Sequence, residues 1–165
     1  MQANDVTGRR GDPMDYDQFV RADARRVRRA LIAYYGSEVG NEAADDAMAL
    51  AWERWADIGS MTNSAGYVFR IGQSKAQRHI RWRNRRAYFP VPDVRVAAAD
   101  VPSAVDLLNA LARLRPDQRT AVTLVKSFGY THLEVAELLG VSASAVNNLV
   151  HRAVVRLRTI LEVSS

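Results

Sequence analysis

The sequence predicts an all-α protein with two small helical domains, joined by a proline-rich linker, and a helix-turn-helix in the C-terminal domain. Apolar residues recur at steps of three and four along most of the chain, which is the helical period. No segment shows the alternation that is typical of a strand. A proline-rich stretch separates the two helical halves, and 165 residues suffice for one or two small domains.

The composition excludes several classes of protein. The chain has no cysteine, which rules out a disulfide scaffold and a thiolate metal site. Its three histidines lack a ligand-like spacing, and no nucleophile or phosphate-loop motif is present. We therefore expect no enzyme, no metal and no cofactor. No stretch approaches the roughly 20 apolar residues of a membrane span, so no membrane partner is expected. The net charge of +5 indicates an anionic partner.

The leading domain is predicted to contain three helices. Residues 1–14 have the Gly, Asp and Pro content of a disordered leader. Helical spacing then predicts helices over residues 15–35, 38–57 and 64–86. The Gly, Ser and Asn content of residues 58–64 predicts a loop before the third helix.

Prolines place the domain boundary. Two prolines two residues apart disfavour a helix after residue 87, so we assign residues 15–87 to the first domain and 88–102 to a linker. The second domain covers residues 103–162. Ser103 is its first expected helix cap, and Pro116 opens the next helix at a first-turn position.

The clearest local motif is a helix-turn-helix beginning at Thr131. Thr131 and Glu134 have the spacing of a capping box at the start of the first helix. Gly140 stands where the turn needs a positive φ, and Ser142 is placed to cap the second helix. An ordinary helical hairpin with a polar face is the alternative interpretation.

In such motifs the second helix enters the DNA major groove. Val146, Val150 and Ala153 share one face, which should pack inward. The opposite face is polar, and an asparagine on it can bond adenine through two hydrogen bonds. The candidate duplex-binding residues are Thr131, Ser142, Ser144, Asn147, Asn148, His151, Arg152 and Arg156.

The predicted third helix is strongly basic. Residues 70–86 contain seven basic residues and no acidic one. On a helical wheel Arg78, Arg81 and Arg85 lie on the side of Arg70, opposite an apolar face. Such a stripe is suited to a phosphate backbone, whereas a solvated surface helix normally mixes its charges.

The predicted second helix has the opposite charge. Six acidic residues stand against one basic residue, Arg54, over residues 38–57. Two interpretations remain open: a solvated face, or a docking surface for a basic protein.

Taken together, these motifs resemble the extracytoplasmic-function (ECF) sigma factors of bacterial RNA polymerase over residues 15–161. In the trailing half, residues 114–119 (LRPDQR) resemble the start of the family's fourth conserved region, and residues 152–158 its usual ending. In the leading half, Ala44-Asp45-Asp46 with Trp52-x-Arg54, and residues 67–74, are similar to segments of the second conserved region.

The resemblance implies an alternative sigma factor with three binding surfaces and a cytoplasmic location. The acidic helix would bind core RNA polymerase, the loop and basic helix would hold the melted −10 strand of promoter DNA, and the helix-turn-helix would read the −35 element. An anti-sigma factor is a further candidate partner. The implied polymerase-binding residues are Asp45, Asp46, Glu53 and Arg54. The candidates for the −10 strand and its backbone are Ser60, Met61, Thr62, Asn63, Arg70, Lys75, Arg78, Arg81 and Arg85.

Several positions depart from the family pattern. Ala49 and Leu50 stand where a polar pair is usual, and Ser74 replaces an asparagine of the third helix. Asn147 and Leu149 stand where the recognition helix usually carries lysine or arginine. The Ala49-Leu50 pair favours a second hypothesis, a sigma-like regulator that binds duplex DNA without productive polymerase engagement, whereas the arginine-rich third helix and the linker favour the sigma factor. A third hypothesis is an RNA-binding helical protein, since arginine-rich helices also bind RNA.

Overall fold

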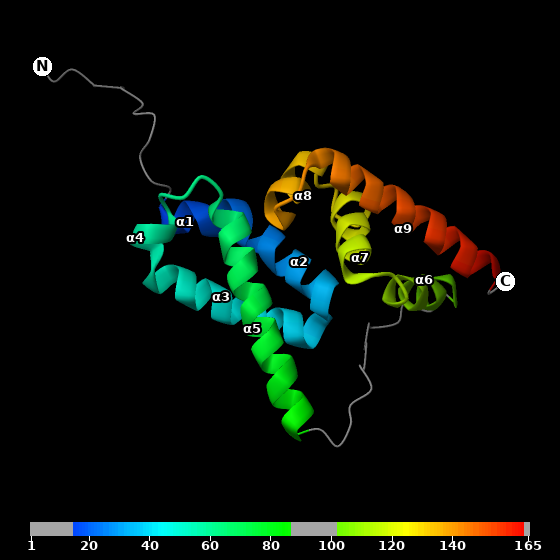
Figure 1. The fold of residues 1–165 in the computed structure, drawn as a ribbon, viewed down its shortest axis with the longest axis horizontal. Helices are drawn as coiled ribbons and strands as arrows, with labels where there is room; N and C mark the ends of the chain where they lie inside the picture. Colours follow the sequence, from blue (N-terminus) through cyan, green and yellow to red (C-terminus); the bar gives the residue numbers. More distant parts are fainter. Residues whose placement is uncertain (1–14, 87–101, 164–165) are drawn as a thin grey trace, which may run out of the picture.

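The computed structural model describes residues 15–86 and 102–163, and each element in these ranges is a helix (Figure 1). The predicted all-α class is confirmed. The predicted leader, residues 1–14, and nearly all of the predicted linker, residues 88–102, lie outside the described residues. The elements are α1 Tyr16–Phe19, η1 Val20–Ala24, α2 Arg25–Tyr35, α3 Ser37–Glu53, α4 Trp55–Ile58, α5 Ser64–Arg86, α6 Pro102–Ala112, α7 Pro116–Val122, η2 Thr123–Ser127, α8 His132–Leu139 and α9 Ala143–Val163.

Two predicted helices are interrupted in the structure. The first contains a π-helical turn, η1, between α1 and α2. The second ends at Arg54, whose φ of −111° and ψ of 21° separate α3 from α4. Beyond this break the Trp55 ring packs 4.9 Å from Phe19 and 5.3 Å from Tyr16, measured between ring centroids. The short α4 thereby packs against α1 at one end of the leading half.

Helices α2, α3 and α5 form the core of the leading half. Helices α2 and α3 lie very close together at Gly40 on α3. A Cβ atom at this position would lie 2.5 Å from the backbone Cα of Ile32 on α2. Only glycine allows the two helices to approach this closely.

In the trailing half, α7, α8 and α9 pack together with α6 alongside α9. The predicted caps of the helix-turn-helix are confirmed. Thr131 and Glu134 form the capping box of α8, and Gly140 ends it with a φ of 69°. The α6 helix begins at Pro102, one residue before the expected cap Ser103, whose side chain lies outside the described ones.

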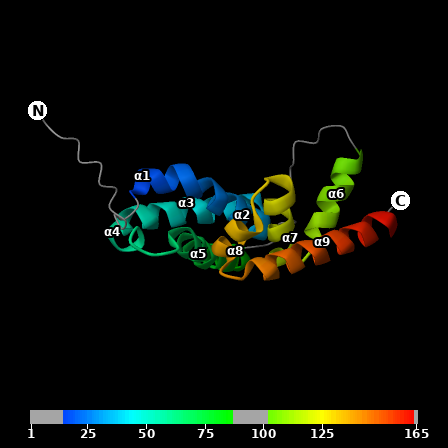
Figure 2. The same ribbon diagram turned by 90° about the horizontal axis from the view of Figure 1, so that it is seen from above.

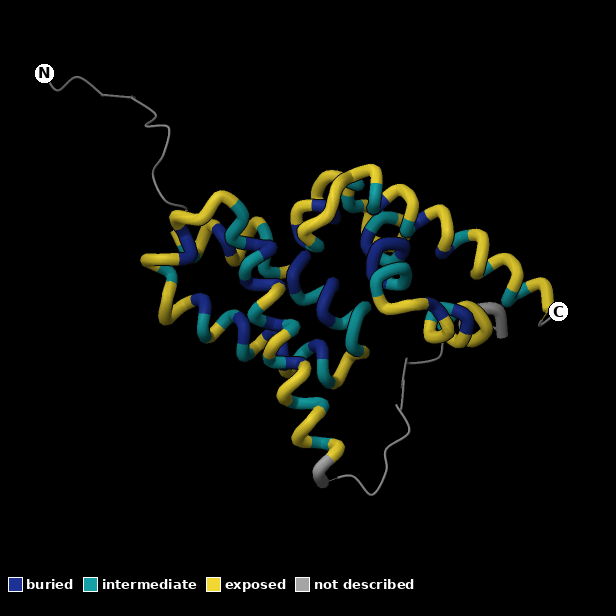
Figure 3. Tube along the Cα trace, viewed as in Figure 1, coloured by how far each residue is buried: buried dark blue, intermediate teal, exposed yellow. Residues whose placement is uncertain are grey.

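The two halves pack against each other: α2 contacts α7, and α5 contacts α8. In Figure 2, α5, α8 and α9 lie along one side of the molecule. Figure 3 shows buried segments continuing through the centre, from α2 into α7. One hydrophobic cluster accordingly includes Leu31 of the leading half and Leu124 and Leu138 of the trailing half. No helix in the described part of the chain is long and apolar enough to cross a membrane.

Candidate nucleic-acid interface

The start of α9 presents a polar face to solvent. The Ala145 backbone N–H donates to the Ser142 hydroxyl at 3.0 Å, so Ser142 caps the helix as predicted. Val146, Val150 and Ala153 are buried on the inner side. On the outer side, the predicted residues Ser144, Asn147, Asn148, His151, Arg152 and Arg156 are all exposed. The fold therefore leaves this polar face of α9 exposed to solvent.

Thr131 and Ser142 differ from the other candidates of this group. Both are exposed, but both side chains are used within the fold. The Thr131 hydroxyl accepts from the Glu134 backbone N–H and donates to the Glu134 carboxylate. These two residues position the helices of the motif.

A hollow of about 600 Å³ borders the same helix. Its lining combines the cations Arg152 and Arg156 with the apolar Val155 and Ile160, and Gln118 contributes from α7. Within the described residues, no group of three His, Asp or Glu side chains is placed to hold a metal ion.

The basic helix α5 exposes the predicted stripe. Arg70, Arg78 and Arg81 are exposed, and Lys75 is half-buried. Arg85 falls outside the residues whose side chains are described. Phe69 and Ala76 are buried on the opposite side, as the helical wheel predicts.

The other cations of α5 face the acidic helix α3. The Arg83 guanidinium lies 2.8 Å from Glu38 and 3.2 Å from Glu42. His79 lies 2.8 Å from Asp46 and 3.4 Å from Glu42. The hydrogen bond that Arg83 donates to the Glu38 carboxylate raises the pKa of Arg83. The acidic helix is thus neither simply solvated nor wholly available for docking, because α5 pairs with part of it.

The four predicted polymerase-binding residues remain close together on α3 and at its end. Asp45 is exposed and pairs with Arg28 of α2 at 2.6 Å, and Asp46 pairs with His79. Glu53 and Arg54 are exposed. An exposed tryptophan, Trp52, lies among them, packed edge-on against Tyr16.

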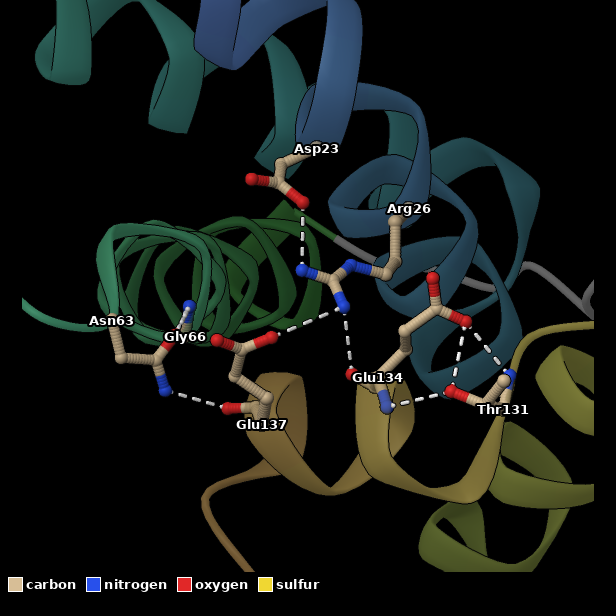
Figure 4. A network of polar contacts seen from close by, with 7 residues as sticks. All are labelled: Asp23, Arg26, Asn63, Gly66, Thr131, Glu134 and Glu137. Carbon is tan, nitrogen blue, oxygen red and sulfur yellow. Dashed lines mark hydrogen bonds and ion pairs between the residues drawn. The ribbon is translucent and has the colours of Figure 1, made fainter. Parts of the chain in front are cut away.

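The predicted −10 loop precedes α5 and contacts the trailing half. Ser60, Met61 and Thr62 are exposed. The Asn63 Oδ1 atom accepts from the Gly66 backbone N–H at 2.8 Å, which caps α5. Its Nδ2 donates to the Glu137 carbonyl of α8 at 2.7 Å (Figure 4).

A buried arginine that the sequence reasoning missed lies beside this contact. Arg26 of α2 is only 6% exposed. Its guanidinium lies 2.7 Å from Asp23, donates to the Glu134 carbonyl at 2.9 Å and lies 3.5 Å from the Glu137 carboxylate (Figure 4). The one signal in the sequence was the arginine-rich run of the first helix, at residues 25–29.

Comparison with known proteins points to one family. The Sigma-70 region 4 family matches residues 104–157. The ECF RNA polymerase sigma factor SigM of Mycobacterium tuberculosis is 30% identical over 155 residues, covering 92% of this chain and 79% of its own. The RNA polymerase sigma factor NccH of Alcaligenes xylosoxydans xylosoxydans is 28% identical over 168 residues, covering 93% and 90%.

Solved structures agree on the fold. The sigma factor RpoE of Bartonella quintana, in complex with the anti-sigma factor NepR, superposes with a TM-score of 0.62 at 21% identity, over 92% of this chain and 99% of its own. CnrH, in complex with the cytosolic domain of CnrY, gives a TM-score of 0.58 at 22% identity, over 91% and 89%. From the helix-turn-helix, the helical leading half and these relatives, we conclude that the chain belongs to the ECF family of RNA polymerase sigma factors.

Proposed function

We propose that this sigma factor divides promoter recognition between its halves. As a member of the family, the chain is an alternative sigma factor that binds core RNA polymerase and directs transcription initiation. The assignment of surfaces is our proposal: the outer face of α9 reads the −35 element, and the loop with the α5 stripe holds the melted −10 strand. The exposed end of α3 docks on polymerase.

The observation that best supports this division is the combination of two DNA-binding faces in one chain. The exposed start of α9 suits base reading in a major groove. The exposed Arg70, Arg78 and Arg81 suit the phosphates of a melted strand. Trp52, beside Glu53 and Arg54, adds an exposed aromatic anchor of the kind that dominates protein interfaces.

The hypothesis of a duplex-binding regulator has less support. Such a regulator needs only the helix-turn-helix, whereas the SigM relative matches 92% of the chain, including the leading half. We further propose that the chain performs no catalysis of its own, that it acts in the cytoplasm, and that an anti-sigma factor is a partner. The last point is supported by the solved structure of RpoE, which is a complex with the anti-sigma factor NepR.

Co-purification with core RNA polymerase tests the polymerase surface. Gel filtration at low salt should show the chain and core enzyme eluting together, and the complex should initiate at specific sites on promoter DNA. We expect Glu53→Lys to weaken the complex, because it reverses a charge beside Trp52. Asp106→Lys, an equal charge change on α6, is the control. Separate elution of the wild-type chain would overturn the proposal.

A change in base preference tests the assignment of α9. Asn148→Ala should alter the preferred upstream sequence, because a bidentate contact to a base discriminates by about 1–3 kcal/mol. Selection of binding sites from a randomised upstream duplex measures the preference. An unchanged preferred site would show that α9 enters the groove in a different orientation.

A further inference from the structure

We infer that the free chain holds itself closed through a latch between its halves, and that this closed form cannot hold a melted −10 strand while reading a −35 element. The latch consists of Arg26 and Asn63 of the leading half with Glu134 and Glu137 of α8. The consequence for DNA binding rests on the proposed function; the latch itself does not.

The latch contacts are directed and partly buried. Arg26 is buried, with 6% of its surface exposed. Its guanidinium donates to the Glu134 carbonyl at 2.9 Å and lies 3.5 Å from the Glu137 carboxylate. Asn63 donates its Nδ2 to the Glu137 carbonyl at 2.7 Å. Because a hydrogen bond from a charged donor is stronger than a neutral one, Arg26 should contribute more to the latch than Asn63 does.

A second contact between the halves lies at Arg29 of α2. Its guanidinium carbon lies 4.1 Å from the centroid of the Phe128 ring, and its Nη1 donates to the Tyr130 hydroxyl at 3.2 Å. Cation–π contacts of this kind add to closure when they are partly desolvated. The latch therefore acts together with the packing of α2 on η2.

The closed form brings the two proposed DNA-binding surfaces together. A Cβ atom at Gly140, in the turn before α9, would lie 3.7 Å from the Arg70 guanidinium of the α5 stripe. The position numbers of the −35 and −10 elements differ by about 25 base pairs, which corresponds to about 85 Å along B-DNA at about 3.4 Å per base pair. Neighbouring surfaces cannot contact both elements of one straight duplex.

Opening is compatible with the length of the chain. Residues 87–101 can span about 50 Å when fully extended. The α9 helix, with 21 residues, is itself about 30 Å long and adds to the distance that the trailing half can reach. Separation of the halves therefore needs only the loss of the contacts between them. In the closed form the Asn63 side-chain amide donates to the Glu137 carbonyl of α8, so this donor is not available to a DNA strand.

A distance measurement in solution tests the latch. The chain has no native cysteine, so Ser74→Cys on α5 and Ser127→Cys on η2 accept spin labels at two exposed sites, one in each half. We expect one narrow distance distribution in the otherwise unchanged chain. Arg26→Met should shift it to longer and broader distances. Arg28→Met is the matched control, because Arg28 lies on the same helix and its bonds to Asn41 and Asp45 stay within the leading half.

Each outcome of this measurement decides the inference. A broad distribution in the unchanged chain, or equal distributions in Arg26→Met and Arg28→Met, would overturn it. If Arg26→Met loses helicity by circular dichroism, Asn63→Asp provides the test. The aspartate keeps the acceptor that caps α5 but lacks the Nδ2 donor, so the same lengthening is expected, and its absence would overturn the latch.

Binding of a single strand tests the consequence for function. We expect Arg26→Met to bind a short, fluorescein-labelled, mixed-sequence single strand about five- to tenfold more tightly than Arg28→Met, because a larger open fraction raises apparent affinity. Both variants lose one positive charge, so general electrostatics are matched. Equal affinities would refute the functional part. A chain that fails to bind core polymerase would refute the proposed function and leave the distance result standing.

Discussion

The arginine side chains of this sigma factor have three kinds of environment. Arg70, Arg78 and Arg81 are exposed on α5. Arg83 is paired with carboxylates of α3. Arg26 donates to a backbone carbonyl across the junction of the halves. Because the guanidinium always stays charged and offers five donors, burial and partners alone decide which of these roles each arginine has.

The Glu134 carboxylate is the clearest case of a single residue with a pH-dependent role. The Thr131 backbone N–H donates to it at 2.8 Å and the Thr131 hydroxyl at 3.0 Å. The hydrogen bond from the Thr131 backbone lowers the pKa of Glu134 from its ordinary 4.5. A carboxylate with a lowered pKa in the folded state stabilises the fold above 4.5, and this stabilisation is lost as the pH falls through the folded-state pKa.

We therefore expect the free energy of unfolding to depend less on pH at acid pH in Glu134→Gln than in the wild type. The free energy of unfolding of the wild type should fall more steeply than that of Glu134→Gln below pH 4.5. Near pH 7 the variant should lose only about 0.5–1 kcal/mol, because glutamine retains part of the capping box. Urea unfolding at a series of pH values measures both, and parallel curves would contradict the prediction.

At the scale of the element, the turn of the helix-turn-helix depends on one backbone conformation. Gly140 has a φ of 69°, where any side chain with a Cβ is strained. We expect Gly140→Ala to destabilise the fold by about 1–2 kcal/mol. Gly140→Asn should cost less, because asparagine adopts this region more readily. Chemical denaturation of both variants provides the comparison, and equal losses would argue against backbone strain as the cause.

The α5 helix should show two classes of arginine in DNA binding. Arg81→Ala should weaken binding across sequences and reduce the slope of log affinity against log salt by about 0.7–0.9. Arg83→Ala removes the same charge, but Arg83 already pairs with Glu38 and Glu42, so the slope should stay nearly unchanged. Fluorescence anisotropy at several salt concentrations measures the slopes. Equal reductions would show that both side chains reach phosphates.

At the scale of the whole molecule, one arginine ties the trailing half to the end of α2. Arg119 donates from Nε to the Ala33 carbonyl at 2.7 Å and from Nη2 to the Tyr34 carbonyl at 2.8 Å. Carbonyls in the last turn of a helix lack partners within the helix. Burial lowers the pKa of Arg119. The side chain thus acts as a cap supplied by the other half of the chain.

We expect Arg119→Met to lower the free energy of unfolding by about 2 kcal/mol, because hydrogen bonds from a charged donor are lost. Arg115→Met is the control four residues earlier. The Arg115 side chain is 76% exposed and lies 3.5 Å from the Asp117 carboxylate. The free energy of unfolding should therefore fall by no more than about 0.5 kcal/mol in Arg115→Met. Urea denaturation of both variants tests the difference. Similar losses would show that the contacts of Arg119 with α2 add little stability.

Local chemistry determined much of this protein from the sequence alone. The all-α class, the capping box at Thr131, the left-handed Gly140 and the buried face of α9 all depend on residues within a few positions of one another. The helical period and the capping preferences act at that range, so a linear reading captures them. The outward direction of Arg78 and Arg81 follows from the same period.

The tertiary structure alone decided which surfaces meet. The pairing of His79 and Arg83 with α3, the cap that Arg119 gives to α2, and the latch at Arg26 join residues 33 to 108 positions apart. No periodicity in the sequence encodes such contacts, because they depend on how completed helices pack and on which polar groups that packing removes from water. The sequence therefore determined the helices and their exposed chemistry, while packing decided which charges remain free for DNA and polymerase.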